Sequence, residues 1–180
     1  MSLQNTPAAY GGIAKFFHWI IFLLLLFMII FGYFLEDIPK AYQSFTYNFH
    51  KLTGLTILSL MVLRGMWALM NPKPLLPFSV PVWQRFAERT VHYLFYFVII
   101  AMPVVGWIGS VAGGRPPRLG EFKFNLPLEQ NKELSEAAFN LHSVLAITII
   151  VLFTIHVTAA LYHHFIKRDN VLRRMMSYRT

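Results

Sequence analysis

Two histidines on one apolar segment are the residues of this sequence whose spacing points most directly to chemistry. His142 and His156 lie fourteen residues apart within the largely apolar residues 139–166. In an α-helix, fourteen steps of roughly 100° end within about 40° of the starting direction and about 21 Å further along the axis. Ionisable side chains inside a membrane are costly and mark functional sites. Two imidazoles at this separation predict two stacked haems rather than one metal ion.

Each of these haems needs a second axial ligand at the same depth. His50 stands at the start of the second apolar segment, on the same side of the membrane as His142, so we pair these two for an outer haem. His18 and His92 both lie near the depth of His156, and depth alone does not separate them. A histidine such as His92 can equally be a neutral side chain bonded to a neighbouring backbone or hydroxyl group. Ligation by two histidines saturates the iron and favours electron transfer over oxygen binding.

Arg64 gives independent support for an inner site. It follows His50 by fourteen residues, so it shares that face of the helix and reaches the depth of the inner haem. A buried guanidinium requires an anion, and a haem propionate would supply one. The alternative is that Arg64 extends to the membrane interface and meets water there.

His163 is a candidate contact for a second substrate. It follows His156 by seven residues and so points about 20° from the same face, whereas its neighbour His164 points roughly 100° away. An imidazole below the inner haem could hydrogen-bond a quinone carbonyl or pass protons to it. The alternative is an interfacial histidine that meets lipid headgroups or a propionate.

The composition tells which elements must position these residues. The chain has 180 residues, of which 56% are hydrophobic and 13% charged, and its mean hydropathy is +0.51. These values are typical of an integral membrane protein. Four segments are long enough to cross a bilayer as helices, residues 13–35, 48–70, 90–112 and 138–166. We therefore predict an all-α membrane protein, a single domain over residues 1–180 built as a bundle of four antiparallel transmembrane helices.

The distribution of basic residues predicts the orientation of the bundle. Nine Lys or Arg residues fall in the N-terminal segment, the second loop and the C-terminal tail, and six fall on the other side. The positive-inside rule then places both termini in the cytoplasm, in a multi-pass protein of the bacterial inner membrane. We expect the basic tail to meet anionic lipid headgroups, and we predict no nucleic-acid partner.

The loops and the absence of cysteine narrow the chemistry further. Without cysteine the chain has no disulfide, no iron–sulfur cluster and no covalently attached haem, so histidine or methionine must hold any haem. The inner loop, residues 71–88, contains Pro72, Pro74, Pro77 and Pro81, which separate the second helix from the third. The outer loop, residues 113–136, begins Gly-Gly-Arg-Pro-Pro, and we predict an irregular lid over the outer end of the bundle.

These residues together resemble the bacterial cytochrome b561 family of dihaem inner-membrane proteins. The resemblance covers nearly the whole chain and is most specific in the ordered histidines and the tail. The matching segments are Phe17-His18-Trp19, Phe49-His50-Lys51 with Gly54, Met102-Pro103-Val104-Val105-Gly106, Leu141-His142 through His156 to Ala160-Leu161-Tyr162-His163-His164, and Lys167-Arg168-Asp169-Asn170 followed by Leu172-Arg173-Arg174-Met175-Met176.

The resemblance implies two haem b groups held by the first, second and fourth helices, which selects His18 over His92 as the partner of His156. It also implies electron exchange with the quinone pool. One branch of the family takes electrons from superoxide on the outer side and passes them to ubiquinone. Other relatives are cytochrome subunits that link quinone to hydrogenases or other dehydrogenases.

A superoxide substrate requires an outer surface that attracts an anion. An anion is attracted by a positive funnel, and Lys51, Arg115 and Arg118 flank the outer haem in the sequence, with Lys40 and Lys123 nearby. Acidic residues in the same loop balance them, so the alternative is that these charges only mark the membrane boundary. We predict a superoxide:ubiquinone oxidoreductase. The alternative function is an electron-transfer subunit that docks a periplasmic redox protein.

Overall fold

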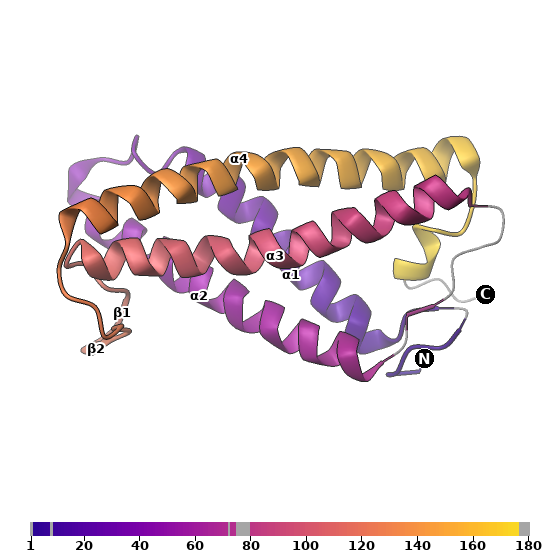
Figure 1. Cartoon of the computed structure of the whole chain (residues 1–180), viewed down its shortest axis with the longest axis horizontal. Coiled ribbons are helices and arrows are strands. Elements are labelled where there is room, and N and C mark those ends of the chain that lie inside the picture. The colour runs from indigo at the N-terminus through magenta and orange to yellow at the C-terminus, as the bar shows by residue number, and fades with distance from the viewer. Residues whose placement is uncertain (1, 8, 72, 75–79, 177–180) are drawn as a thin grey trace.

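The computed structural model describes residues 2–7, 9–71, 73–74 and 80–176. These residues form four long helices, α1 (Gly12–Tyr33), α2 (Lys40–Met70), α3 (Val82–Ala112) and α4 (Lys132–Tyr162). Each is long and apolar enough to cross a membrane. The helices run alternately up and down in one elongated bundle (Figure 1). The prediction of a four-helix membrane protein is therefore confirmed.

Three of the helices begin earlier than the hydropathy predicted, by eight residues at α2 and α3 and by six at α4. The reason is that hydropathy detects only the part of a helix within hydrocarbon, whereas polar turns extend each helix into the interface. Consequently His50 and His142 do not begin their helices: each lies ten residues after the start, at Lys40 and Lys132. The predicted loops 71–88 and 113–136 are correspondingly shorter.

Local sequence explains where these earlier starts fall. Pro39 and Pro81 immediately precede α2 and α3, and their φ angles of −52° and −57° already suit a helical turn. Asn131 caps α4, because its side-chain oxygen accepts a hydrogen bond from the Leu134 backbone N–H at 2.9 Å. Pro72, Pro77 and Arg179, which entered the loop and charge predictions, lie outside the described residues.

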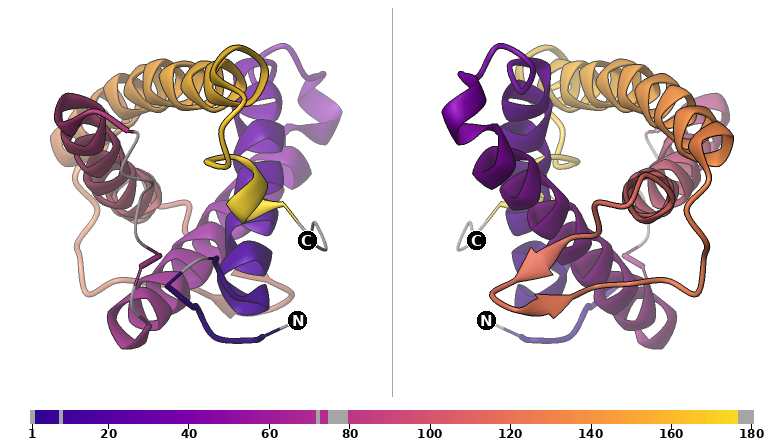
Figure 2. Two further views of the ribbon diagram at one scale, coloured as in Figure 1. Left: turned by 90° about the vertical axis from the view of Figure 1, so that its right-hand side faces the viewer. Right: turned by 90° about the vertical axis from the view of Figure 1, so that its left-hand side faces the viewer.

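The helices pack mainly against their neighbours in the sequence. Close contacts join α1 to α2, α2 to α3 and α3 to α4, whereas within the described residues α4 makes no comparably close contact with α1 or α2. Viewed along the bundle axis, α3 and α4 lie on one side and α1 and α2 on the other (Figure 2). The core is one apolar layer at mid-depth, formed by Ile21, Leu25, Ile57, Met61, Val98, Ile99, Leu145, Ile149 and Leu152.

The end of the bundle away from the termini carries the loop predicted as a lid. Here two short strands, β1 (Arg118–Leu119) and β2 (Phe122–Lys123), form an antiparallel hairpin that the sequence analysis did not predict. Gly120, with a φ of 59°, allows its tight turn. The Trp107 indole N–H donates a hydrogen bond to the Phe124 carbonyl at 2.8 Å and fixes the hairpin to α3. We call this end the outer end.

Both termini lie at the opposite end, the inner end (Figure 1). After α4 the chain forms a π-helical turn, η1 (His163–Lys167), and then a short 3-10 helix, η2 (Arg173–Met175). This tail returns to α1: the Trp19 indole N–H donates to the Met175 carbonyl at 2.9 Å, and the Lys15 ammonium to the Met176 carbonyl at 3.1 Å. The names inner and outer follow the predicted orientation.

Candidate functional site

Two histidine pairs lie at different depths of the bundle, and α4 contributes one member to each. His142 of α4 faces His50 of α2 toward the outer end, with 6.2 Å between ring centres. His156 of α4 faces His18 of α1 toward the inner end, also with 6.2 Å between ring centres. The structure thus brings together the residues that depth and the family resemblance paired. In each pair, the two histidines come from helices that are not in close contact with each other: α4 and α2 at the outer pair, and α4 and α1 at the inner pair.

The separation within each pair fits one metal atom between two imidazoles. With metal–nitrogen distances of about 2.0–2.1 Å, and about 1.1 Å from nitrogen to ring centre, two opposed imidazoles have ring centres about 6.3 Å apart. Within the described residues, no group of three or more His, Cys, Asp and Glu side chains could hold a metal ion. The ligands available are therefore paired histidines, as in a haem whose macrocycle supplies the other donors.

Hydrogen bonding at the outer pair leaves ring nitrogens available. The Nδ1 atom of His142 lies 3.1 Å from the carbonyl oxygen of Met102 on α3. Because a carbonyl only accepts, Nδ1 carries the hydrogen, and Nε2 keeps its lone pair for a metal. The Nδ1 atom of His50 is buried without a hydrogen-bond partner among the described residues. A buried nitrogen without a partner lowers the stability of the fold, unless the ring binds a group that the protein chain does not supply.

Glycine on α3 makes room for the His142 ring. A Cβ atom added at Gly106 would lie 3.0 Å from both Cε1 and Nδ1 of that ring, closer than ordinary van der Waals contact. A side chain here would therefore displace the imidazole from its bond to Met102. Gly65 offers a contrast on α2, since its added Cβ would meet only Tyr96, at 3.9 Å.

We expect Gly106→Ala to lower the affinity of the outer site for haem, because the added methyl group shifts the ligand ring. The measurement is the haem-to-protein ratio of the purified variant by haemochrome absorbance. Gly65→Ala is the matched control and should retain the full haem content. Equal haem content in the two variants would contradict the packing argument.

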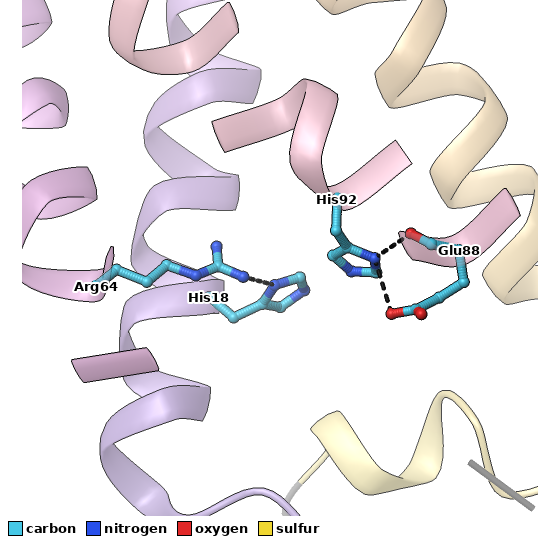
Figure 3. Close-up of polar contacts among 4 residues, drawn as sticks. All are labelled: His18, Arg64, Glu88 and His92. Atoms are coloured by element: carbon cyan, nitrogen blue, oxygen red, sulfur yellow. Dashed lines mark hydrogen bonds and ion pairs between the residues drawn. The ribbon is translucent and has the colours of Figure 1, made fainter. Parts of the chain in front are cut away.

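At the inner pair, Arg64 lies beside His18. Its Nη2 atom is 3.5 Å from Nδ1 of His18 (Figure 3). Its guanidinium lies 5.6 Å from the centre of the Tyr96 ring. The side chain therefore points into the bundle and does not extend to the interface. Within the described residues, no carboxylate lies within ion-pair distance of Arg64. A haem propionate would provide the missing anion.

His92 also lies close to His156, with ring centres 5.4 Å apart. Its Nδ1 atom is 2.7 Å from the Glu88 carbonyl oxygen and 2.9 Å from a Glu88 carboxylate oxygen (Figure 3). This is the backbone-bonded histidine that the sequence analysis gave as the alternative to a ligand. The spacing to His156 is also shorter than two axial ligands require. Both observations favour His18 as the partner of His156.

A cavity occupies the space between the inner histidines. His18, His92 and His156 line it together with Arg64, and aromatic and apolar side chains such as Phe95 and Met61 complete its wall. A cavity with apolar walls, opposed imidazoles and one cation has the donor set that a haem with acidic side chains requires. The residues present therefore fit a b-type haem.

The predicted basic residues gather above the outer pair. The Lys51 ammonium donates a hydrogen bond to the Arg115 carbonyl at 2.7 Å, so the outer loop is tied to α2 one residue from His50. Asn48 binds the Arg118 backbone twice, since its amide N–H donates to the carbonyl and its oxygen accepts from the N–H, both at 2.8 Å. The side chains of Arg115 and Arg118 are exposed. The sequence analysis did not identify Asn48, because its contact with the Arg118 backbone exists only in the folded loop.

His163 stands in the π-helical turn that ends α4, at the inner end. Its Nδ1 atom lies 2.5 Å from a carboxylate oxygen of Asp169, and the two side chains are only 15% and 20% exposed. The sequence analysis named Asp169 only as part of the tail segment that resembles the family, and gave it no role. The tight reversal that returns Asp169 to His163 carries no hydropathy signal. His164 has a buried Nδ1 atom without a hydrogen-bond partner among the described residues.

Comparison with known proteins shows the family to which this chain is similar. The family profile of prokaryotic cytochrome b561 matches residues 9–178. Cytochrome b561 homolog 2 of Escherichia coli is 32% identical over 182 aligned positions, which cover 98% of this chain and 95% of that protein. Cytochrome b561 homolog 1 of the same organism is 31% identical over 55% of this chain and 56% of its own length. A probable superoxide oxidase CybB of Yersinia pestis is 30% identical over 88% of this chain and 90% of its own length.

Four membrane-spanning helices, two opposed histidine pairs and a family match over nearly the whole length lead to one conclusion. The chain belongs to the prokaryotic cytochrome b561 family and is a multi-pass bacterial membrane oxidoreductase that binds haem b and transfers electrons.

Proposed function

We propose that this chain binds two haem b groups and transfers electrons from superoxide at its outer end to ubiquinone at its inner end. The observation that carries the proposal is the presence of two histidine pairs with the same 6.2 Å spacing, one at each end of α4. One axial site of this kind would serve a single face of the membrane. Two at different depths form a route across it.

His50 and His142 would hold the outer haem, and His18 and His156 the inner one, with Arg64 neutralising a propionate. When bound, the haems supply one-electron redox chemistry. The protein residues fix the orientation of the ligands, as the Met102 carbonyl does for His142. The apolar layer between the two pairs, which includes Leu145 and Ile149 of α4, excludes water from the space between them.

The outer end supports an anionic one-electron donor. Superoxide is a small anion, and Lys51, Arg115 and Arg118 place three cationic side chains around the loop above the outer pair. Such a cluster raises the local concentration of an anion and its rate of encounter. The relative named a probable superoxide oxidase supports the same substrate, and the superoxide would leave as O2 after giving up one electron.

The inner end supports a quinone. Reduction of one quinone to a hydroquinone consumes two electrons and two protons, so it requires a residue that can deliver protons. His163 is such a residue, because it lies in the π-helical turn directly after α4, below the inner pair, and its side chain is only 15% exposed and is hydrogen-bonded to Asp169. The bacterial inner membrane is the location that the charge distribution and this acceptor favour.

We expect His163→Ala to retain both haems and to slow oxidation of the reduced protein by ubiquinone about a hundredfold, because general acid catalysis typically contributes this much. The measurement is stopped-flow absorbance after mixing the chemically reduced protein with ubiquinone in the absence of oxygen. His164→Ala is the control, since helical spacing predicts that this side chain points roughly 100° away from the face that carries His156. An unchanged rate in His163→Ala would remove the proton-delivery role.

A second candidate function is a cytochrome subunit that docks a periplasmic redox protein. The hairpin at the outer end favours it, because Leu119 and Phe122 are each 64% exposed there and could pack against a partner. The two functions differ in whether an electron donor other than superoxide is needed.

One experiment separates them. The purified, oxidised protein is mixed with superoxide in a stopped-flow spectrometer, with and without ubiquinone. Reduced b-haem bands that appear rapidly and then decay with ubiquinone would support the superoxide:ubiquinone oxidoreductase. Bands that respond to dithionite but not to superoxide would favour the docking subunit, and no haem bands at all would overturn both.

A further inference from the structure

The chain reverses direction directly after His163 and returns a carboxylate to its ring. Arg168 adopts a left-handed conformation, with φ 52° and ψ 33°, which closes the turn after the π-helical residues. The Asp169 backbone N–H then donates a hydrogen bond to the His163 carbonyl at 3.2 Å. One carboxylate oxygen of Asp169, Oδ2, lies 2.5 Å from Nδ1 of His163. The backbone thus holds the carboxylate and the imidazole against each other.

The second carboxylate oxygen of Asp169 is also occupied. Oδ1 accepts a hydrogen bond from the Val171 backbone N–H at 3.0 Å. With both oxygens engaged, the carboxylate cannot rotate freely. An ionised carboxylate only accepts hydrogen bonds, so Nδ1 of His163 must carry a hydrogen. The other ring nitrogen, Nε2, then takes up or gives away the mobile proton.

Burial strengthens this interaction. The two side chains are 15% and 20% exposed, so water competes weakly for their hydrogen-bonding groups. A carboxylate in contact with Nδ1 keeps the ring hydrogen on that nitrogen, so the lone pair of Nε2 stays available to a proton. The pair can therefore accept a proton from the aqueous side and hold it at Nε2.

We propose that Asp169 is a positioning residue for quinone reduction, which holds His163 in the tautomer that presents Nε2 to a quinone oxygen. The inference rests on the proposed function, because it requires a quinone at the inner end. In the proton step, the Nε2–H bond of the imidazolium breaks as an O–H bond forms on one quinone oxygen. The second proton comes from water, and the two electrons come from two superoxide anions, each released as O2. Water then reprotonates His163.

The Val171 bond makes an asparagine substitution informative. In Asp169→Asn, the Val171 N–H still requires an acceptor and so retains the amide oxygen on its side. The amide NH2 group must then face Nδ1 of His163 and donate to it. This forces the ring hydrogen onto Nε2, the wrong tautomer for a proton carrier, with almost no change in shape. Asp37→Asn is the matched control, because Asp37 is the other aspartate of the chain and lies near the outer end.

The experiment mixes haem-loaded protein, reduced with dithionite, with ubiquinone-1 under anaerobic conditions. We expect Asp169→Asn to lower the maximal rate of haem oxidation roughly tenfold to a hundredfold, with the KM for ubiquinone and the haem spectrum unchanged. Asp37→Asn should match the wild type. Double substitution with His163→Ala should be no slower than His163→Ala alone, because the two residues act as a unit.

Nitrogen-15 NMR of labelled histidine gives a readout independent of activity. The wild type should show the His163 hydrogen on Nδ1 and Asp169→Asn should show it on Nε2. A maximal rate for Asp169→Asn within twofold of the wild type would overturn the inference. A wild-type ring protonated only on Nε2 would also overturn it, even if the variant failed to fold. A wild type that does not react with ubiquinone would instead refute the proposed function.

Discussion

On the proposed ligation, replacing His142 with alanine should lower the haem content of the purified protein from two haem b groups per chain to one. The reason is that α4 supplies one imidazole to each pair, and each alanine removes one of two axial ligands. His156→Ala should have the same effect on the inner site. The double variant should contain no haem. The measurement is the haemochrome absorbance relative to protein concentration.

The two single variants should differ in their remaining haem. His142→Ala leaves the pair near Arg64, and His156→Ala leaves the pair below the basic outer loop, so their reduced spectra and midpoint potentials should not coincide. His92→Ala is the control for the inner site, since its ring bonds to Glu88, and it should keep two haems. If His92→Ala lost the inner haem and His18→Ala retained it, His92 rather than His18 would be the ligand that pairs with His156.

Reversing the charge of Arg115 and Arg118 together should slow reduction of the protein by superoxide on the order of a hundredfold at low salt. These side chains are exposed, and their backbones are held by Lys51 and Asn48, so the substitution changes the field without loosening the loop. The effect should shrink as ionic strength rises, because salt screens exposed charges. The measurement is the rate of haem reduction by superoxide at several salt concentrations.

Lys132→Glu is the matched control for this charge reversal. It reverses one charge at the start of α4, half the change made by the double substitution, at an ammonium that already pairs with Glu136 at 3.6 Å. If it slowed the reaction as much per charge as the Arg115 and Arg118 substitutions, net charge alone would account for the effect. A rate independent of salt in the wild type would argue against steering altogether.

The helices and histidines could be predicted because both depend on local periodicity. An apolar segment long enough to cross a bilayer identifies a helix, and a fourteen-residue spacing places two side chains on one face whatever lies around them. The starts of α2, α3 and α4 were predicted too late, because their first turns are polar. Pro39, Pro81 and Asn131 marked these starts, and capping signals deserve equal weight with hydropathy in such helices.

Other features could not be predicted because they exist only once distant segments meet. Depth alone left His18 and His92 equivalent as partners of His156. The family resemblance, the Glu88 contacts and the 5.4 Å spacing between the His92 and His156 rings distinguish them. The return of Asp169 to His163 depends on a left-handed residue at Arg168, which the sequence does not reveal. The hairpin at the outer end likewise depends on contacts from Asn48 and Trp107.

The neighbour-by-neighbour packing of the helices bears on the order in which this protein assembles. Since α1 packs on α2, α2 on α3 and α3 on α4, each newly inserted helix finds its partner in the helix made just before it. Within the described residues, the contacts of α4 with α1 and with α2 are the ones that the chain leaves incomplete. On the proposed ligation, the inner haem joins α1 to α4 and the outer haem joins α2 to α4, so their binding is linked to closure of the bundle. Apoprotein should therefore be an open assembly intermediate, and cofactor supply should determine how much of the chain reaches its closed form.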